Sequence, residues 1–433
     1  MRIILTLAIA LLVADDVHAQ QNRIDLVRHD APELAYPGPY DIGVRTVEWM
    51  HADQVDVLKS SGLSEPARYD RKLVVEFWYP ARLTAKQSPG EPYVSDTRNL
   101  SVTASLHGQA VRDAEPRRDL GAVPLIILSH GYPGNRYLMS HLAENLASKG
   151  YVVASIDHLE STYRDQNSVW STLYHRPLDQ RFVIDKTAYF SDINRHFLNG
   201  IVDTDQVGIV GYSMGGYGLL VNIGAGYSDA TIALAEDLPA SIAAMHAASS
   251  QTHHSSADPR IKAGLAIAPC CMNRGMWDAD GLSRIETPLL LMAGNSDETA
   301  GYDSGVRKIY DLAVNSDRYL LTFLNAGHNA IAPIPLPLEI HESNDQAGAF
   351  HYTDAVWDSV KSSNVMTHFA TAFFDLQLKA DHGKADYLQL EPNAEDGVWA
   401  LENDQSGDAH TYWLGFPNYS ARGLVLDHDA PAH

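Results

Sequence analysis

A serine framed by glycines, in Gly211-Tyr212-Ser213-Met214-Gly215, follows a short apolar run of the sequence. This Gly-x-Ser-x-Gly order is typical of a strand, a sharp turn that holds a nucleophile, and a helix. The glycines leave room for a strained turn that would push Ser213 Oγ out above a sheet. The backbone N–H of Met214 would begin the helix and could stabilise an oxyanion. A serine in an ordinary glycine-rich turn is the simpler alternative, and the residues downstream argue against it.

Two later segments supply an acid and a base in the chain order Ser, acid, His. The apolar run 288–293 is followed by Asp297, which we predict as the acid, and the adjacent Glu298 is the alternative. The last predicted core strand, residues 319–324, is followed by His328, which we predict as the base. The histidine would take the serine proton and return it to the leaving group, while the acid would fix its tautomer.

Aromatic and apolar residues near the predicted strand ends are candidates for the rest of the site. The backbone N–H of Tyr132 is the expected second oxyanion donor, and its ring would lie over the site. His130 is expected to bond within its own loop rather than to act as a second base. Trp170, Met276 and Trp277 are expected in loops, where they would line an apolar pocket or pack under a lid.

Neither a metal nor an organic cofactor is expected, because a serine nucleophile with its base needs none. His253 and His254 lie in a serine-rich segment that reads as an exposed loop, with metal binding as the less favoured alternative. Cys270 and Cys271 are adjacent, and neighbouring cysteines can bridge only by closing a small ring. We therefore predict two buried free thiols and no zinc site there.

A parallel sheet is expected to position these residues. Residues 123–225 alternate between strand and helix patterns, which predicts right-handed crossovers and helices on both faces of the sheet, an α/β fold. The strands expected before the serine motif are residues 123–129 and 151–157, with helices over 137–149 and 181–197.

Other elements are expected on either side of this region. Residues 44–49 and 72–79 predict an antiparallel pair of strands, and residues 80–121 read as loop. A further strand is expected over 262–268 and a long amphipathic helix over 355–378.

The N-terminus has the pattern of a signal peptide over residues 1–19, with cleavage expected after Ala19 and a short uncleaved anchor as the alternative. This pattern predicts a secreted or periplasmic protein. A hydrolase domain is expected over residues 20–379 and a packed C-terminal extension over 380–433. Lid-like insertions are expected at about residues 158–176, 226–260 and 332–352.

The composition limits the partners of the protein. The chain has 433 residues and a net charge of −22, which argues against nucleic acid and anionic membranes. No apolar run after the first twenty residues is long enough to span a bilayer. The expected partner is a small-molecule or polymeric ester, and the sequence does not indicate an oligomeric state.

With these motifs in hand, residues 38–380 resemble α/β-hydrolases of the serine dienelactone-hydrolase-like group. They are also similar to platelet-activating-factor acetylhydrolases and bacterial cutinase-type polyester hydrolases. The matching positions are residues 75–81, 129–132, 176–179 and 211–216, with Asp297 and His328. Dienelactone hydrolases carry cysteine at the position of Ser213, so their substrate does not carry over. Acetylhydrolases place their acid just after the strand that precedes residue 288, but residues 268–271 of this chain hold no carboxylate. The position of Asp297 therefore resembles that of the acid in cutinase-type enzymes.

The resemblance implies a secreted serine carboxylic-ester hydrolase that works through an acyl-enzyme. The same machinery would serve for a polyester, a lactone, an amide or a β-diketone, because the leaving group is recognised by loops. A non-catalytic binding module on the hydrolase scaffold is the alternative from a different class.

Overall fold

The structure is a computed structural model of the chain and describes residues 22–254, 257–402 and 405–432. The predicted signal peptide, residues 1–19, lies outside the described residues.

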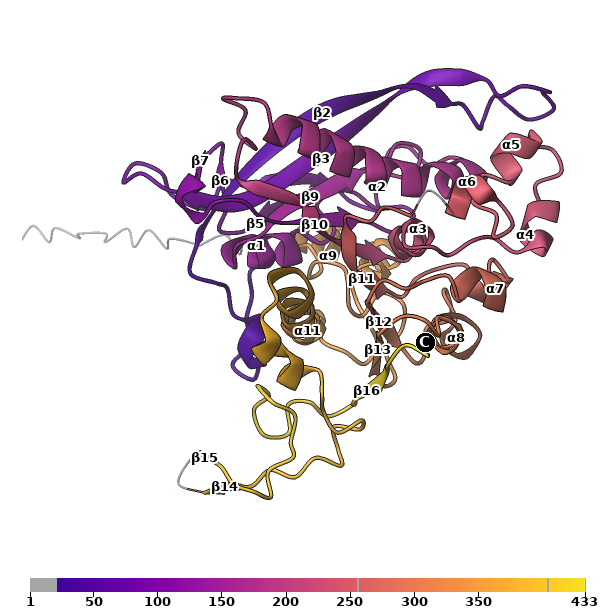
Figure 1. Ribbon diagram of the computed structural model, residues 1–433. Helices are drawn as coiled ribbons and strands as arrows, with labels where there is room; N and C mark the ends of the chain where they lie inside the picture. The colour runs from indigo at the N-terminus through magenta and orange to yellow at the C-terminus, as the bar shows by residue number, and fades with distance from the viewer. Residues whose placement is uncertain (1–21, 255–256, 403–404, 433) are drawn as a thin grey trace, which may run out of the picture.

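A twisted, mostly parallel sheet runs through the described chain, with helices on both faces, which confirms the predicted α/β fold class (Figure 1). Its strand order is β16-β13-β12-β11-β10-β8-β9-β3-β2-β6. The parallel strands are β8 (Val123–Ser129), β9 (Val152–Asp157), β10 (Val202–Tyr212), β11 (Ile261–Ile267), β12 (Leu289–Gly294) and β13 (Arg318–Phe323). The antiparallel strands are β2 (Asp41–Val55), β3 (Arg68–Arg82) and β16 (Leu424–Asp429).

Alternate residues of each central strand face opposite cores, because side chains alternate across a sheet. Ile126 and Leu128 of β8 join the core beneath α1 (Ser140–Ser148) and α11 (Ser359–Lys379). Leu125 and Ile127 join the opposite core, beneath α2, α3 (Met214–Asn222), α7 (Ala279–Leu282) and α8 (Arg307–Leu312). Burial on both faces explains why these strands are continuous apolar runs in the sequence.

The helix predicted over residues 181–197 is wrong in its position, since α2 spans Val169–Ser191 and contains Pro177. Ser168 caps its start by accepting a hydrogen bond from the N–H of Trp170. Proline lacks an N–H and so frees the carbonyl of the residue one turn earlier, Leu173. The hydroxyl of Tyr217 donates to that carbonyl at 2.7 Å, so the neighbouring helix α3 compensates for the proline.

The prediction that residues 80–121 form a loop is wrong, because several short strands lie in this segment. They contain the strands β4 (Tyr93–Asp96) and β5 (Thr103–His107), which form a small separate sheet with β1 (Asn22–Arg23). Of two further short strands, β6 (Val111–Arg112) pairs with β2 at the edge of the main sheet, and β7 (Glu115–Pro116) pairs with the end of β3.

The segments between the core elements contain short helices. Those of residues 226–260 are α4 (Asp229–Ala233), α5 (Ala240–Ala243) and α6 (Gln251–His254), and those of residues 332–352 are α9 (Leu338–Glu342) and α10 (Gln346–Phe350). Single turns of other helix types are η1 (Glu33–Ala35), η2 (Arg118–Leu120), η3 (Met272–Arg274), η4 (Tyr302–Val306) and η5 (His382–Tyr387). The long β2–β3 ribbon crosses the top of the view, and its tip packs against α5 (Figure 1).

The C-terminal segment lies against the sheet and α11, at the bottom of the view (Figure 1). Strand β16 pairs antiparallel with β13 along the edge of the main sheet. Trp413 and Phe416 pack on Phe369 of α11, at ring-centroid distances of 5.8 Å and 6.0 Å. Residues 412–416 form turns, and the remaining strands are β14 (Leu401–Glu402) and β15 (Gln405–Ser406).

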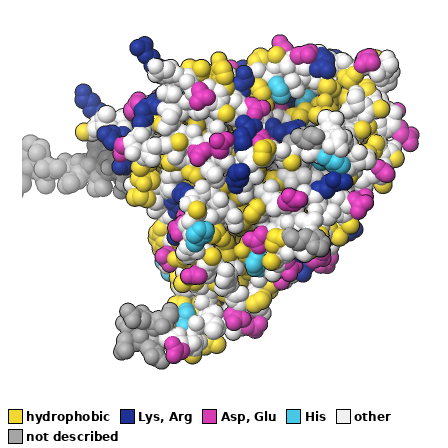
Figure 2. Space-filling model, viewed as in Figure 1, with side chains coloured by type: hydrophobic (Ala, Val, Ile, Leu, Met, Phe, Trp, Pro, Cys, Tyr) yellow, Lys and Arg dark blue, Asp and Glu magenta, His cyan; other side chains and the backbone are white. Residues whose placement is uncertain are grey.

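Acidic side chains are spread over the visible face and are interspersed with Lys and Arg (Figure 2). The net charge of −22 is therefore not gathered into one acidic patch on this face. None of the helices in the described ranges is long and apolar enough to cross a membrane.

Candidate active site

Ser213 lies at the sharp turn between β10 and α3, with φ 53° and ψ −111°. This positive φ is costly for a residue with a side chain and marks a constrained turn. A Cβ at Gly215 would lie 1.9 Å from the carbonyl oxygen of Ser129, and a Cβ at Gly211 would lie 2.3 Å from the oxygen of Gly215. Only glycine fits at either position, so the sequence motif follows from the packing of the turn.

The structure brings Ser213, His328 and Asp297 together. His328 Nε2 lies 3.1 Å from Ser213 Oγ, and His328 Nδ1 lies 2.7 Å from Asp297 Oδ2. The other carboxylate oxygen, Asp297 Oδ1, accepts the N–H groups of Thr299 and Ala300 at 2.8 Å and 2.9 Å. A carboxylate only accepts hydrogen bonds, so Nδ1 of the histidine carries the proton and Nε2 faces the serine as an acceptor.

Neighbouring residues hold the histidine loop in place. The ring of Tyr212 lies 5.2 Å from that of His328, and its hydroxyl donates to Asn329 Oδ1 at 2.8 Å. Asp354 accepts the N–H of Gly327 at 2.8 Å. Glu298, the alternative acid, is exposed, so Asp297 is the carboxylate that meets the histidine.

Both predicted oxyanion donors belong to segments that lie next to the serine. Met214 is the first residue of α3, so its N–H has no carbonyl one helical turn earlier to bond. Tyr132 follows Gly131 in the loop after β8, and a Cβ at Gly131 would lie 3.3 Å from Ser213 Cβ. This loop therefore runs directly against Ser213. The Tyr132 hydroxyl donates to the carbonyl of Asn167.

His130 bonds within its own loop, as expected, because its Nδ1 lies 2.7 Å from the carbonyl oxygen of Gly131. Burial is the main cause that lowers the pKa of His130 well below its usual value, followed by the charge of Arg176. Arg176 donates to the carbonyl of His130 and to Ser161 Oγ, the latter at 2.6 Å. The guanidinium thus supports the loop that carries Tyr132.

A cavity of about 310 Å³ opens beside the serine. Its lining combines residues of the predicted site with residues from distant segments: Arg98, Gly131, Tyr132, Pro133, Tyr212, Ser213, Thr299, His328, Asn329, Ala347, Phe350 and His351. Thr299 and Asn329 adjoin the predicted acid and base, so the motifs themselves could have indicated them. Phe350 and His351 belong to the predicted lid-like insertion at residues 332–352, whereas nothing in the sequence pattern points to Arg98.

Three candidate pocket residues do not line this cavity and pack in apolar clusters instead, which is the alternative that the sequence left open. Trp170 lies at the start of α2 and packs near Ile242 of α5. Trp277 is buried behind α3, where its ring stacks on that of Tyr217 at 5.9 Å. Met276 is buried in the same core. All three pack in apolar clusters because their large side chains gain more from burial than from lining a half-polar cleft.

A second Ser–His–Asp set, which the sequence analysis missed, lies next to the first. His158 Nε2 lies 2.8 Å from Ser129 Oγ, and His158 Nδ1 lies 3.0 Å from Asp179 Oδ2. Arg71 grips both carboxylate oxygens of Asp179, at 2.8 Å and 2.9 Å. Burial is the main cause that lowers the pKa of His158 to about 3, with the charge of Arg176 adding to it.

Cys270 and Cys271 form a disulfide, so the prediction of two free thiols is wrong. The backbone of Cys271 is left-handed, with φ 90°, and this turn brings the neighbouring sulfurs together. The pair lies beside Ser213, since the N–H of Cys270 donates to the carbonyl of Ser213 at 3.1 Å. Cys270 Sγ lies 3.9 Å from Met214 Sδ.

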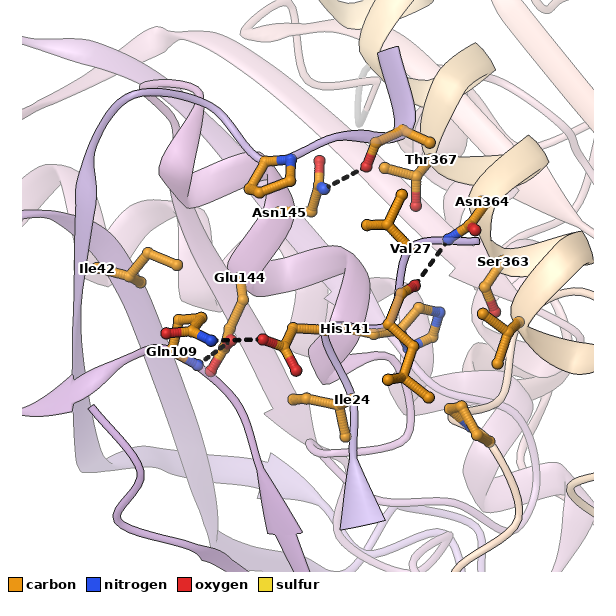
Figure 3. Close-up of a pocket in the computed structure, with 16 residues that line it drawn as sticks. Ile24, Val27, Ile42, Gln109, His141, Glu144, Asn145, Ser363, Asn364 and Thr367 are labelled. Atoms are coloured by element: carbon orange, nitrogen blue, oxygen red, sulfur yellow. Dashed lines mark hydrogen bonds between the residues drawn. The ribbon is translucent and has the colours of Figure 1, made fainter. Parts of the chain in front are cut away.

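A second cavity, of about 170 Å³, lies between the N-terminal segment, α1 and α11 (Figure 3). Asn145 donates to the carbonyl of Ala35 at 2.8 Å, and Asn364 donates to that of Leu26 at 2.9 Å (Figure 3). These bonds tie the N-terminal segment to the two helices. The cavity shares no lining residue with the one beside Ser213, so we give it no role in the chemistry.

The described residues contain no group of three or more His, Cys, Asp or Glu side chains placed to hold a metal ion. The pair His253 and His254 therefore belongs to no such group within the described ranges.

Three comparisons with known proteins bear on this site. A family model described as PET hydrolase-like matches residues 80–236. Dipeptidyl aminopeptidase BIII from Pseudoxanthomonas mexicana is 29% identical over 217 residues, which are 46% of this chain. The chain covers only 29% of that relative's length.

The structure of a ferulic acid esterase from Streptomyces cinnamoneus is similar at a TM-score of 0.52. It is 20% identical, and the similarity covers 81% of this chain and 94% of that one, so it bears on the fold alone. The family model and the curated relative together support a serine hydrolase in general terms. The chain belongs to the α/β-hydrolase superfamily.

Proposed function

We propose that the protein is a secreted serine carboxylic-ester hydrolase in which Ser213, His328 and Asp297 are the catalytic residues. The observation that carries the proposal is the continuous chain of contacts from Ser213 Oγ through His328 to Asp297, at 3.1 Å and 2.7 Å, at the wall of a cavity. Secretion is proposed from the N-terminal pattern of residues 1–19.

In this mechanism Ser213 Oγ attacks the ester carbonyl while its proton passes to His328 Nε2. Asp297 stabilises the imidazolium that forms, and the N–H groups of Met214 and Tyr132 receive the developing oxyanion. The histidine then gives the proton to the departing alcohol, which leaves an acyl-enzyme. Water, activated by the same histidine, hydrolyses the acyl-enzyme and restores the serine.

The similar proteins include an esterase and an aminopeptidase, so they do not decide whether the bond that is cleaved is an ester or an amide. The lining of the cavity favours an ester. An aminopeptidase must recognise the ammonium group at the end of its substrate, for which a carboxylate is the natural partner. The cavity beside Ser213 is lined by Arg98 and by no Asp or Glu of the described residues. A polyester, lactone or β-diketone substrate would use the same machinery.

A fluorophosphonate, which reacts with activated serines, tests the proposal through the intact mass of the protein. We expect one adduct on the wild type and none on Ser213→Ala, because Ser213 is the only serine of the described residues that has both a base and access to the cavity. Ser129→Ala is the matched control and should still form one adduct, since Ser129 is fully buried. Ester turnover should fall by about 10⁴-fold or more in Ser213→Ala. Full activity of that variant would overturn the proposal.

A further inference from the structure

One cationic side chain borders the cavity of the proposed esterase without a partner for its charge. Arg98 is the only Lys, Arg, Asp or Glu among the described residues that line this cavity. Its side chain is exposed. No carboxylate of the described chain lies within 4.0 Å of its guanidinium, and none of the described residues accepts a hydrogen bond from it.

The free state of Arg98 contrasts with the rest of a strongly acidic protein. The neighbouring Arg164 grips both oxygens of Asp96 at 2.5 Å, and Arg136 pairs with Asp157 at 2.5 Å. The sequence has 54 acidic and 32 basic residues, so we expect an arginine of this protein to be paired with a carboxylate. A guanidinium left unpaired at the mouth of a cleft is a ready site for an incoming anion.

The turn that carries Arg98 is held on both sides. Thr97 is fully buried, and its hydroxyl lies 2.9 Å from the carbonyl oxygen of Asn99 and 2.8 Å from that of Val102. Asn135, in the loop after β8, donates to Ser95 Oγ at 2.9 Å. The β4–β5 turn is therefore fixed relative to the loop that supplies the oxyanion donor Tyr132.

The other groups around the cavity do not offset this positive charge. Burial is the main cause that lowers the pKa of His351 to about 3, and the charge of Arg98 is the next cause, so this ring is neutral at pH 7. Asp297 is buried and engaged by His328. Phe350, which is 70% exposed, offers an aromatic surface beside the cleft.

We propose that the physiological substrate is an ester that also carries a carboxylate, joined to the scissile ester through an apolar spacer. The geometry points to Arg98 as the residue that binds the carboxylate, while Phe350 and Tyr132 contact the spacer. The negative charge of the whole protein repels an anionic ester. The positive charge of Arg98 would offset this repulsion locally and allow such an ester to bind in the cleft. The inference rests on the proposed esterase function and specifies its substrate class.

Matched pairs of ethyl esters test the inference: monoethyl succinate with ethyl butanoate, monoethyl adipate with ethyl hexanoate, and monoethyl suberate with ethyl octanoate. The members of each pair differ only in a terminal carboxylate or methyl group. The readout is the ratio of kcat/KM for the acidic ester to kcat/KM for the neutral one, at low salt. We expect Arg98→Gln to lower this ratio about tenfold for at least one pair, mainly through KM, and Arg98→Lys to lower it less.

Arg164→Gln is the matched control, because it changes the net charge equally on a neighbouring side chain that is already paired with Asp96. Its ratio should stay within about twofold of the wild type. Added salt should lower the ratio in the wild type more than in Arg98→Gln. An unchanged ratio in Arg98→Gln for every pair, with the neutral esters still hydrolysed, would overturn this inference alone. Failure of the wild type to hydrolyse any of the esters would overturn the esterase proposal as well.

Discussion

Two sets of Ser, His and Asp lie side by side in this protein, and their internal distances are nearly the same. The contacts are 3.1 Å and 2.7 Å in the set of Ser213, and 2.8 Å and 3.0 Å in the set of Ser129. The two serines are close, since a Cβ on Gly215 would touch the carbonyl of Ser129. Hydrogen-bond geometry alone therefore does not distinguish a catalytic set from a structural one.

The surroundings of the two sets differ in access and in charge. Ser213 lines a cavity, whereas Ser129 is fully buried at the end of β8. The acid of the second set, Asp179, is gripped by Arg71, and this pair keeps the pKa of the carboxyl well below its usual range although burial would raise it. His158, with its pKa lowered to about 3, is a poor base at neutral pH. The second set is therefore placed to support the loop beside Ser213, and it has neither an exposed serine nor a histidine that is basic at neutral pH.

The largest expected difference between the sets comes from replacing the acid of each by asparagine. Asp297→Asn should lower turnover by about 10³–10⁴-fold, because the histidine loses its fixed tautomer, with little change in stability. Asp179→Asn should instead cost about 3–5 kcal/mol of stability, since it leaves the buried Arg71 without its main counter-charge. Urea unfolding measures the stability, and turnover is normalised to the fraction that a fluorophosphonate labels.

The assignment of one set to catalysis and the other to stability is contradicted if Asp297→Asn and Asp179→Asn show each other's expected effects. A stable Asp179→Asn protein that is labelled but a thousandfold slower would place Asp179 in the chemistry. An Asp297→Asn protein that unfolds without losing turnover per labelled site would make its role structural.

The second expected difference is a pH dependence of stability. His158 is neutral in the folded protein down to about pH 3, whereas the unfolded chain binds a proton there below about pH 6.5. Stability should therefore fall as the pH drops from 6.5 toward 3, by up to about 1.4 kcal/mol per pH unit for this residue. In His158→Gln, the slope of unfolding free energy against pH between 6.5 and 4.5 should be smaller by about that amount.

His382→Gln is the control for the pH experiment, because His382 is exposed and its variant should keep the wild-type slope. Equal slopes in the wild type and His158→Gln would contradict a neutral, buried His158. Other buried histidines, such as His246 and His368 with pKa values lowered to about 3 mainly by burial, add to the wild-type slope but cancel in the difference.

The sequence predicts the first set and not the second because the signals differ in range. Ser213, Asp297 and His328 each follow an apolar strand or adjoin glycines, and these are local patterns. Ser129 ends β8 and His158 follows β9, but their pairing depends on burial and on Arg71, which reaches Asp179 of α2 from β3. The residues of the cavity wall are likewise brought together from distant segments of the chain, and local sequence patterns do not show such contacts.

Long-range packing also explains why some elements of the fold were predicted incorrectly from the sequence and why some candidate pocket residues lie elsewhere. Pro177 reads as a helix breaker, and only the hydroxyl of Tyr217 from another helix makes it tolerable inside α2. Arg98 reaches the cavity on a turn between two short strands whose polar sequence is typical of loop. Trp170 and Trp277 were candidates for the pocket wall because they are aromatic, yet Trp277 is buried in the core and Trp170 packs, partly buried, against a small apolar cluster.

The smallest expected difference comes from removing the buried hydroxyl in Ser129→Ala. Since His158 Nδ1 faces the carboxylate of Asp179, its Nε2 accepts the Ser129 hydroxyl, and alanine leaves that nitrogen buried without a donor. The cost should be about 1–2 kcal/mol in urea unfolding. Turnover of ethyl hexanoate should stay within about threefold of the wild type, because Ser213, His328 and the cavity are untouched. A drop of a hundredfold at unchanged stability would mean that the two sets act as one, with Ser129 positioning the oxyanion loop during catalysis.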